Sequence, residues 1–173
     1  MKVLAFGASN STTSINKQLA AYAARLVENA EVSILDLNDF ELPLYSADVE
    51  AEIGHPEAAK NFLAQVESAD LLVISFAEHN GSYTAAYKNL FDWASRIQQK
   101  VYEDKKVVLL ATSPGPGGAK TVLAAATVSM PFFGAEVVGS LSVPAFFDNF
   151  DVESQQLTEE SLITDLKGLM AKS

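Results

Sequence analysis

Two apolar runs constrain the fold of this 173-residue chain more than any other feature. The segments DLLVISF (70–76) and KVVLLAT (106–112) are almost continuously apolar, without alternation between apolar and polar residues. Such runs are typical of strands that are covered on both faces, as the strands of a parallel sheet are. Helices are therefore expected on both sides of a sheet that contains these two strands.

Strand-like and helix-like segments alternate along the whole chain. Three more segments have the character of strands: 2–6, 31–37 and 135–143. Apolar residues recur at helical spacing in the segments that follow the strands: 14–28, 56–68, 83–98, 118–132 and 158–172. With right-handed crossovers, this order predicts an α/β domain of three layers, a doubly wound, parallel five-stranded sheet in the flavodoxin-like order 2-1-3-4-5. No linker or repeat interrupts residues 1–173, which are predicted to form a single domain with a surface loop at 37–55.

The composition excludes several classes of function. A net charge of -10 argues against binding to nucleic acid or to anionic membranes, because both need a basic surface. The absence of cysteine excludes disulfides, thiolate nucleophiles and cysteine-based metal sites, and we expect no metal centre. No apolar run is long enough for a membrane helix, and the N-terminus has the pattern of a strand rather than of a signal peptide. We therefore expect a cytoplasmic protein.

The loops that follow the first and third strands should flank the ligand crevice of such a sheet. The first loop, GASNSTTSIN (7–16), places five serines or threonines within the six positions Ser9–Ser14 at the start of a helix. Free N–H groups and the dipole of a helix start, together with hydroxyl groups, can hold a phosphate without the help of a positively charged side chain. The alternative is that these residues are only helix caps and turn residues.

Two further loops reach the same edge of the sheet. Residues 77–82 carry the run Ala-Glu-His-Asn-Gly-Ser, and SPGPGGAKT (113–121) offers backbone amides that could approach a flat ligand closely. The chain has neither the Gly-Lys-Ser/Thr ending of a P-loop nor a Gly-x-Gly-x-x-Gly fingerprint, which argues against ATP, GTP or a dinucleotide fold. Together, the three loops suit a phosphate joined to a planar heterocycle.

The stretch AEHNGSYTAAYKNLFDWASR (77–96) resembles a signature of the NADPH-dependent FMN reductase family. The family pattern is Pro-Glu-Tyr-Asn-Gly-Ser followed by Leu-Lys-Asn-Ala-Ile-Asp-Trp-Ser-Arg, and the shared positions here are Glu78, Asn80, Gly81, Ser82, Lys88, Asn89, Asp92, Trp93, Ser95 and Arg96. The first loop is similar to the family's at Gly7, Ser14, Asn16 and Leu19. The third loop is similar at Ser113, Gly117 and Gly118.

The resemblance implies that FMN is bound, with NADPH or NADH as the electron donor. It places FMN on residues of the three loops: Ser9, Ser11, Ser14, Ile15, Asn16, Glu78, His79, Asn80, Gly81, Ser82, Ser113, Gly115, Gly117 and Gly118. It also implies a homodimer or homotetramer built partly on the third and fourth predicted helices, 83–98 and 118–132. The chain departs from the family in having no arginine in the first loop, Ala77 in place of a proline, and His79 where an aromatic ring often lies against the flavin.

The function implied is that of an NAD(P)H-dependent flavin oxidoreductase, in which hydride passes from the nicotinamide through FMN to a quinone, azo compound or similar small acceptor. No catalytic side chain is assigned, because the cofactor carries the chemistry in such enzymes. The alternatives are a flavodoxin-like electron carrier or a non-enzymatic module that binds flavin or another phosphate ligand.

Several of the residues in these stretches also have an ordinary structural interpretation. Glu78 is expected to cap amides or to anchor a neighbouring loop, and His79 to lie near the flavin or to be idle in solvent. Four aromatic residues of the helix predicted at 83–98 could lie in the core or at a subunit interface: Tyr83, Tyr87, Phe91 and Trp93. Phe132 and Phe133 are expected in the core.

Overall fold

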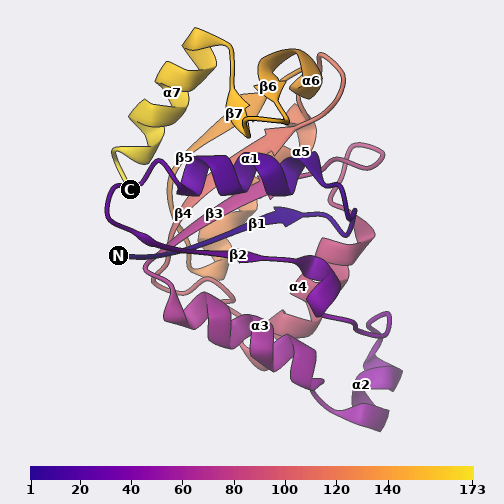
Figure 1. Cartoon of the computed structure of the whole chain (residues 1–173). Coiled ribbons are helices and arrows are strands. Elements are labelled where there is room, and N and C mark those ends of the chain that lie inside the picture. The colour runs from indigo at the N-terminus through magenta and orange to yellow at the C-terminus, as the bar shows by residue number, and fades with distance from the viewer.

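The computed structural model describes residues 1–173 and shows one parallel sheet of five strands. The strands are β1 (Lys2–Ala8), β2 (Glu31–Leu35), β3 (Leu71–Phe76), β4 (Lys106–Thr112) and β5 (Glu136–Val143). Their order in the sheet is β2-β1-β3-β4-β5, and every neighbouring pair is parallel. The predicted fold class and strand order are therefore confirmed (Figure 1).

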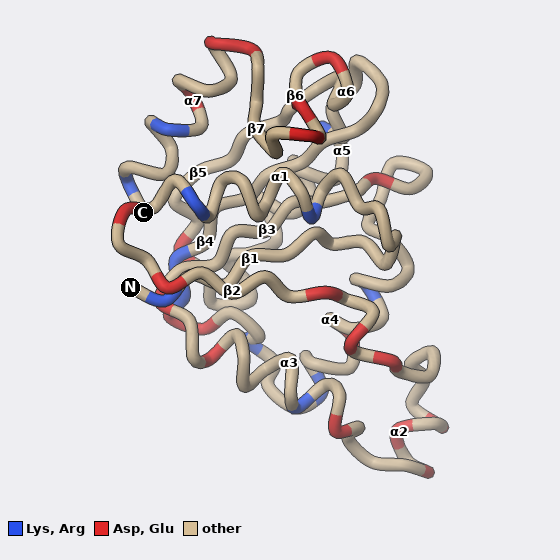
Figure 2. Tube along the Cα trace, in the orientation of Figure 1, with Lys and Arg blue, Asp and Glu red and all other residues tan.

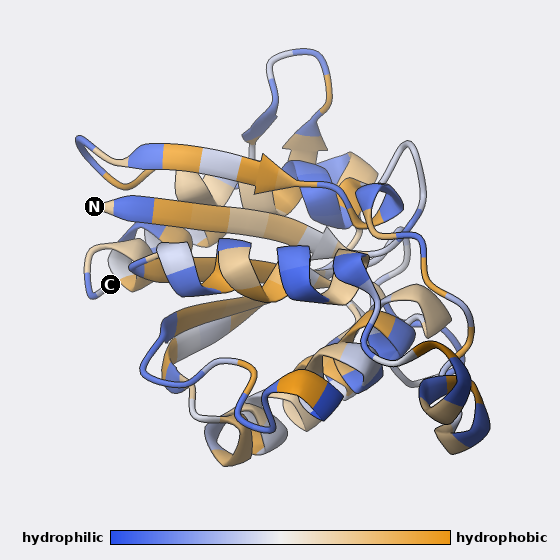
Figure 3. Cartoon of the chain, turned by 90° about the horizontal axis from the view of Figure 1, so that it is seen from below, coloured by the Kyte–Doolittle hydropathy of each residue, from blue (hydrophilic) through white to orange (hydrophobic).

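Helices cover both faces of the sheet and enclose two separate cores. On one face lie α1 (Ile15–Ala24) and α7 (Glu160–Met170), and on the other α3 (Glu57–Ser68), α4 (Ala85–Ile97) and α5 (Lys120–Ser129). Every residue of β3 is buried, because its side chains alternate between these two cores. In Figure 3 most of β1, the strand that follows the N-terminus, has the colour of apolar residues, and all of its residues but the first are buried.

The structure differs from the sequence-based prediction in three segments. The predicted loop 37–55 contains a short 3₁₀ helix (Leu37–Asp39) and the helix α2 (Ala47–Ile53). Between β5 and α7 the chain forms the short helix α6 (Phe146–Asn149) and a hairpin of β6 (Phe150–Asp151) and β7 (Gln156–Leu157). The helix predicted at 118–132 ends at Ser129 and continues as a 3₁₀ turn, Met130–Phe133.

The two ends of the sheet differ: one end carries both chain termini, and the other carries an uncharged loop at the start of α1. Both chain termini lie at the end opposite to the loops that follow β1, β3 and β4 (Figure 1). Figure 2 shows acidic residues in most parts of the chain and an uncharged segment where α1 begins, because residues 9–16 carry no charge. No helix is both long and apolar enough to cross a lipid bilayer.

Candidate functional site

The carboxyl ends of three adjacent strands bring the three predicted loops together. Ala8 of β1 pairs with Phe76 of β3, and Phe76 pairs with Ala111 of β4, so the strands end almost level. The loops 9–14, 77–84 and 113–119 therefore leave the sheet side by side (Figure 1). This is the edge where ligands bind in open parallel sheets, and here it includes the point at which the strand order reverses, between β1 and β3.

The first loop ends in a capped helix start whose donors are only partly used. The hydroxyl oxygen of Ser14 accepts a hydrogen bond from the N–H of Lys17 at 3.1 Å, and that of Ser9 accepts one from Ser11 at 3.1 Å. The backbone N–H groups of Ile15 and Asn16 make no hydrogen bond within the protein. Since both serines only accept in these bonds, their hydroxyl protons also remain available, and the loop can donate to an anion.

Gly7 allows α1 to start directly against β1. A Cβ atom added to Gly7 would lie 2.8 Å from the Cα of Lys17 and 2.9 Å from the carbonyl carbon of Asn16. These are backbone atoms, which cannot rotate away as the end of a side chain can. The close approach of strand and helix therefore requires glycine at this position.

Asn16 fastens the same helix start to the centre of the sheet. Its amide nitrogen donates to the carbonyl of Thr112 at 3.2 Å, and its oxygen accepts from the hydroxyl of Ser75 at 2.7 Å and from the N–H of Thr112 at 3.1 Å. The side chain is 2% exposed, so it serves these internal bonds. Of the groups of Asn16, only the backbone N–H is free for a ligand.

The second loop is a two-residue hairpin turn. Asn80 and Gly81 both have positive φ, 53° and 74°, and the N–H and carbonyl of His79 pair with those of Ser82 at 3.0 and 3.1 Å. An Asn-Gly pair favours this type of turn because both residues tolerate the left-handed conformation. The residues from His79 to Ser82 are exposed, so the turn projects from the edge of the sheet.

Thr84 connects that hairpin to the first strand, a contact that could not be predicted from the sequence. Its hydroxyl donates to the carbonyl of Ala8 at 2.9 Å and accepts from the N–H of Tyr87 at 3.2 Å, which caps α4. A threonine before an apolar helical run is a recognisable cap signal. The bond to Ala8 depends on the tertiary fold and has no signal in the sequence.

Glu78 has the structural role predicted for it, and it plays this role within one chain. Its carboxylate accepts a hydrogen bond from the N–H of Val122 at 2.9 Å. Helix α5 has no cap of its own, because it follows Ala119, which is in the left-handed conformation at φ 54°. Glu78 therefore supplies the missing cap from a neighbouring loop and joins the second loop to the third.

We expect Glu78→Ala to lower the free energy of unfolding by about 1 kcal/mol, since the Val122 N–H loses its acceptor. Glu78→Gln should retain most of that stability, because its amide oxygen can accept the same bond. Thermal unfolding followed by circular dichroism measures both variants. Equal melting temperatures for Glu78→Ala and the unchanged protein would contradict the capping role.

The third loop contains two adjacent glycines with different roles. Gly118 has φ 61°, and an added Cβ would meet Pro144 at 3.2 Å and the hydroxyl of Ser142 even closer. Around Gly117 an added Cβ meets nothing within 4 Å, and its N–H makes no hydrogen bond. The fold therefore requires Gly118, whereas Gly117 presents a free donor beside open space.

The helix part of the signature holds the segment 37–55 in place. The side chains of Asn89 and Trp93 both donate to the carbonyl of Pro43, at 3.0 and 2.7 Å, and Arg96 pairs with Glu50 of α2 at 3.0 Å. Trp93 is fully buried, and its ring packs edge-on against Tyr45 at 5.1 Å. This part of the signature therefore shapes a wall beside the site and contains no catalytic pair.

The aromatic residues of α4 divide between core and surface. Tyr87 and Trp93 are buried, whereas Tyr83 and Phe91 are half-buried and line a groove between α4 and α5. The prediction that Phe132 lies in the core is wrong: its side chain is 79% exposed, because the 3₁₀ turn that ends α5 points it outward. Phe133 is half-buried and packs on Phe91 with ring centroids 4.7 Å apart.

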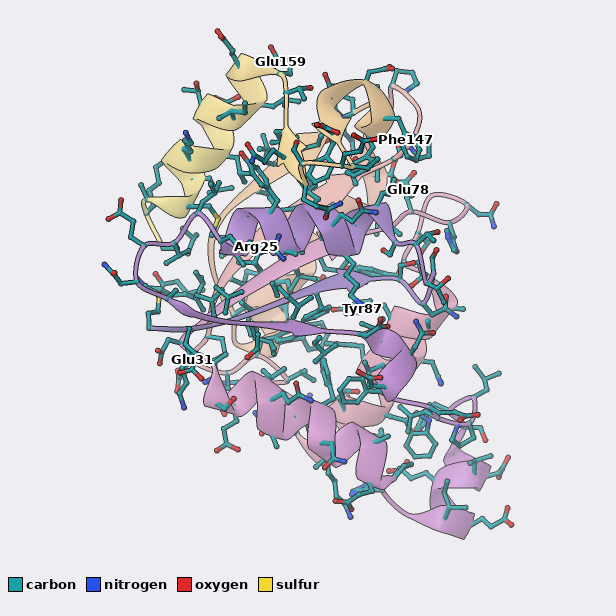
Figure 4. The ribbon with its side chains drawn as sticks, in the orientation of Figure 1. Arg25, Glu31, Glu78, Tyr87, Phe147 and Glu159 are labelled. Atoms are coloured by element: carbon teal, nitrogen blue, oxygen red, sulfur yellow. The ribbon has the colours of Figure 1, made fainter.

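The assembled site offers donors without charge. The start of α1, the exposed hairpin and the glycine loop contribute N–H and hydroxyl groups. The carboxylate on these loops, that of Glu78, already accepts a hydrogen bond from the N–H of Val122. Figure 4 shows Glu78 and Phe147 at this end of the molecule and Arg25 toward the other end of α1. Such a site can bind a phosphate and a planar group, and it lacks a carboxylate pair for acid/base catalysis.

Comparison with known proteins gives a family and several relatives. A family model described as NADPH-dependent FMN reductase matches residues 1–148. The chain is 33% identical over 119 residues to an NAD(P)H-dependent FMN reductase of Pseudomonas aeruginosa, an alignment that covers 68% of this chain and 63% of that protein. It is 37% identical over 98 residues to a quinone reductase of Escherichia coli, covering 56% of this chain and 50% of that protein.

Among solved structures, the fold is similar to that of a flavoenzyme NAD(P)H:(acceptor) oxidoreductase from Paracoccus denitrificans. The TM-score is 0.76 at 26% sequence identity, and the superposition covers 98% of this chain and 93% of the other. The likeness extends beyond the residues that the family model matches, so it includes the C-terminal helix.

Proposed function

The chain belongs to the NADPH-dependent FMN reductase family, and from this membership we propose that it transfers electrons from NAD(P)H through bound FMN to a quinone, azo compound or similar small acceptor. The family match confirms the resemblance drawn from the sequence, and with it the enzyme class and the cofactors FMN and NAD(P)H. The observation that best supports FMN at this site is the pair of unpartnered N–H groups at Ile15 and Asn16.

The first loop fits the phosphate of FMN. The N–H groups of Ile15 and Asn16 and the hydroxyls of Ser9, Ser11 and Ser14 would hold it at the positive end of α1. The family's arginine is absent from the loop, and the uncharged donors take its place.

The other two loops fit the planar ring system. The exposed turn from His79 to Ser82 would lie on one side of it, with Ser113, Gly115, Gly117 and Gly118 on the other. Because Gly117 leaves space and a free N–H, its amide can approach the ring edge and stabilise negative charge there.

Bound FMN supplies the hydride and electron chemistry, so the chain needs no acid/base pair. Its residues bind the phosphate, orient the ring and fix the shape of the space above it. Phe147 of α6 is 63% exposed, and the N–H groups of Ala145 and Phe146 bond to the carbonyls of Gly115 and Ser113 at 2.9 and 3.0 Å. An aromatic side chain attached to this loop favours a planar aromatic acceptor.

A steady-state assay separates this enzyme from the alternative of an electron carrier. The purified protein, supplied with FMN, should oxidise NAD(P)H when a benzoquinone is added and no partner reductase is present. Protein freed of FMN provides the control and should be inactive until FMN is restored. A protein that binds FMN but never oxidises NAD(P)H would be a carrier.

The proposed assembly is a homodimer or homotetramer through α4 and α5. A largely apolar groove of about 230 Å³ lies between these helices, lined by Tyr83, Tyr87, Lys88, Phe91, Ala125, Ser129, Met130 and Phe133. Val128 and Phe132, on α5 and the turn that follows it, are 70% and 79% exposed. Neighbouring exposed apolar residues of this size support a contact with another subunit. The proposed location is the cytoplasm, where nicotinamide cofactors are available.

We expect Phe132→Glu to weaken this self-association at least about tenfold, because a carboxylate would be buried without a partner. Light scattering after size-exclusion chromatography measures the mass. Val152→Glu, at another exposed apolar residue on the hairpin β6–β7, is the control and should leave the mass unchanged. An unaltered oligomer for Phe132→Glu would place the interface elsewhere.

A further inference from the structure

A second groove starts at the phosphate loop and follows the outer side of α1. It encloses about 360 Å³, and its lining begins with Thr12, Thr13 and Ser14. The remaining lining residues are Lys17, Gln18, Ala21 and Arg25 of the helix, Ile34 of β2 and Gln155 of the hairpin β6–β7. Figure 1 shows α1 lying between β2 and this hairpin. The groove thus shares Ser14 with the proposed phosphate site and leads away from it.

The length and the lining of the groove suit a nucleotide. Arg25 lies eleven residues after Ser14, so at about 1.5 Å per residue the helical wall runs about 16 Å. Ala21 and Ile34, which is 37% exposed, give the wall an apolar part. The side chain of Gln155 donates to the oxygen of Gln18 at 3.1 Å, and the amide nitrogen of Gln18 remains free to donate.

Of the two cationic side chains that line the groove, Lys17 and Arg25, only one is free to contact an anionic ligand. Lys17 forms an ion pair with Asp36, and this bond holds the pKa of the Asp36 carboxyl below its usual value, so the lysine is largely neutralised. Arg25 forms no ion pair in the structure. Figure 2 shows a basic segment toward each end of α1. Arg25 is therefore the free cation at the far end of a groove that begins at a phosphate site.

We propose that this groove binds the phosphorylated adenosine half of a dinucleotide, an inference that rests on the proposed function. The hydroxyl groups of Thr12 and Thr13, which line the groove beside the flavin phosphate, receive the phosphates of this half. Ala21 and Ile34 support the adenosine, and Arg25 contacts its outer phosphate or its ring. Two dinucleotides carry this half: FAD, in which it extends from the flavin phosphate, and NADPH, in which it carries a 2′-phosphate.

Three titrations of Arg25→Ala test the proposal and show whether the groove binds the adenosine half of FAD or that of NADPH. Protein without flavin is titrated with FMN and with FAD, and FMN-loaded protein with adenosine 2′,5′-bisphosphate. We expect Arg25→Ala to weaken FAD or the bisphosphate about five- to tenfold and to leave FMN affinity within about twofold. If only the affinity for FAD falls, the groove binds the adenosine half of FAD. If only the affinity for the bisphosphate falls, the groove binds the adenosine half of NADPH.

Two control variants separate this contact from a general effect of charge. Arg25→Lys should restore part of the affinity, since it keeps the charge. Lys60→Ala removes an exposed cation from α3, on the other face of the sheet, and should change nothing. Affinities for FAD and for the bisphosphate that are both unchanged in Arg25→Ala would overturn the proposal. Failure of the unmodified protein to bind FMN would instead contradict the proposed function.

Discussion

Gly7→Ala is expected to lose both stability and FMN. The added methyl group would press on the backbone of Lys17 and Asn16, so the start of α1 must move away from β1. That shift stretches the buried bonds of Asn16 to Ser75 and Thr112. We expect a loss of about 2–3 kcal/mol in the free energy of unfolding and at least about a tenfold weaker binding of FMN.

Denaturant unfolding and flavin titration measure these two losses. Gly168→Ala is the matched control, because Gly168 lies in α7 with open space around its Cα. That substitution should stabilise the protein by up to about 1 kcal/mol, as alanine favours a helix more than glycine does. Wild-type stability and FMN affinity in Gly7→Ala would show that the helix start tolerates displacement.

Gly117→Val should lose FMN while the fold stays intact. The protein leaves space for this side chain, so the melting temperature should change by no more than about 2 °C. The same space is where the flavin ring would approach, and we expect FMN affinity to fall at least about tenfold. Unchanged affinity would remove this loop from the site.

Gly118→Val is expected to have the opposite effect to Gly117→Val, because it should destabilise the fold rather than only weaken FMN binding. Its side chain would meet Ser142 and Pro144 on a backbone with φ 61°, so it should destabilise the fold itself. Calorimetry of the two valine variants thus separates a ligand contact from a structural requirement, one residue apart in the chain.

Most of the fold could be predicted because burial on both faces leaves a mark on the sequence. The run 70–76 has no exposed face to carry polar residues, and the structure buries all of β3. Helix α2 left no such mark, since none of its residues is buried. Its start is capped by Ser46, and Glu50 ties it to Tyr45 and Arg96, contacts that depend on the tertiary fold.

The meeting of the three loops of the candidate site could be predicted from the sequence, but the contacts of their residues could be predicted only in part. The strand order indicated which loops meet, and the junction of loop and helix pointed to Glu78 as a cap. The internal bonds of Asn16 could not be foreseen, because its partners are 59 and 96 residues away. The different roles of Gly117 and Gly118 likewise depend on Pro144, which comes from another loop.

One spectroscopic measurement tests the central claim most directly. The purified protein is mixed with FMN, desalted, and placed under anaerobic conditions before NADPH and then a benzoquinone are added. Our account predicts that the visible flavin bands remain after desalting, bleach with NADPH without any partner protein, and return with the quinone. Loss of all flavin on desalting, or retained bands that NADPH never bleaches, would contradict it.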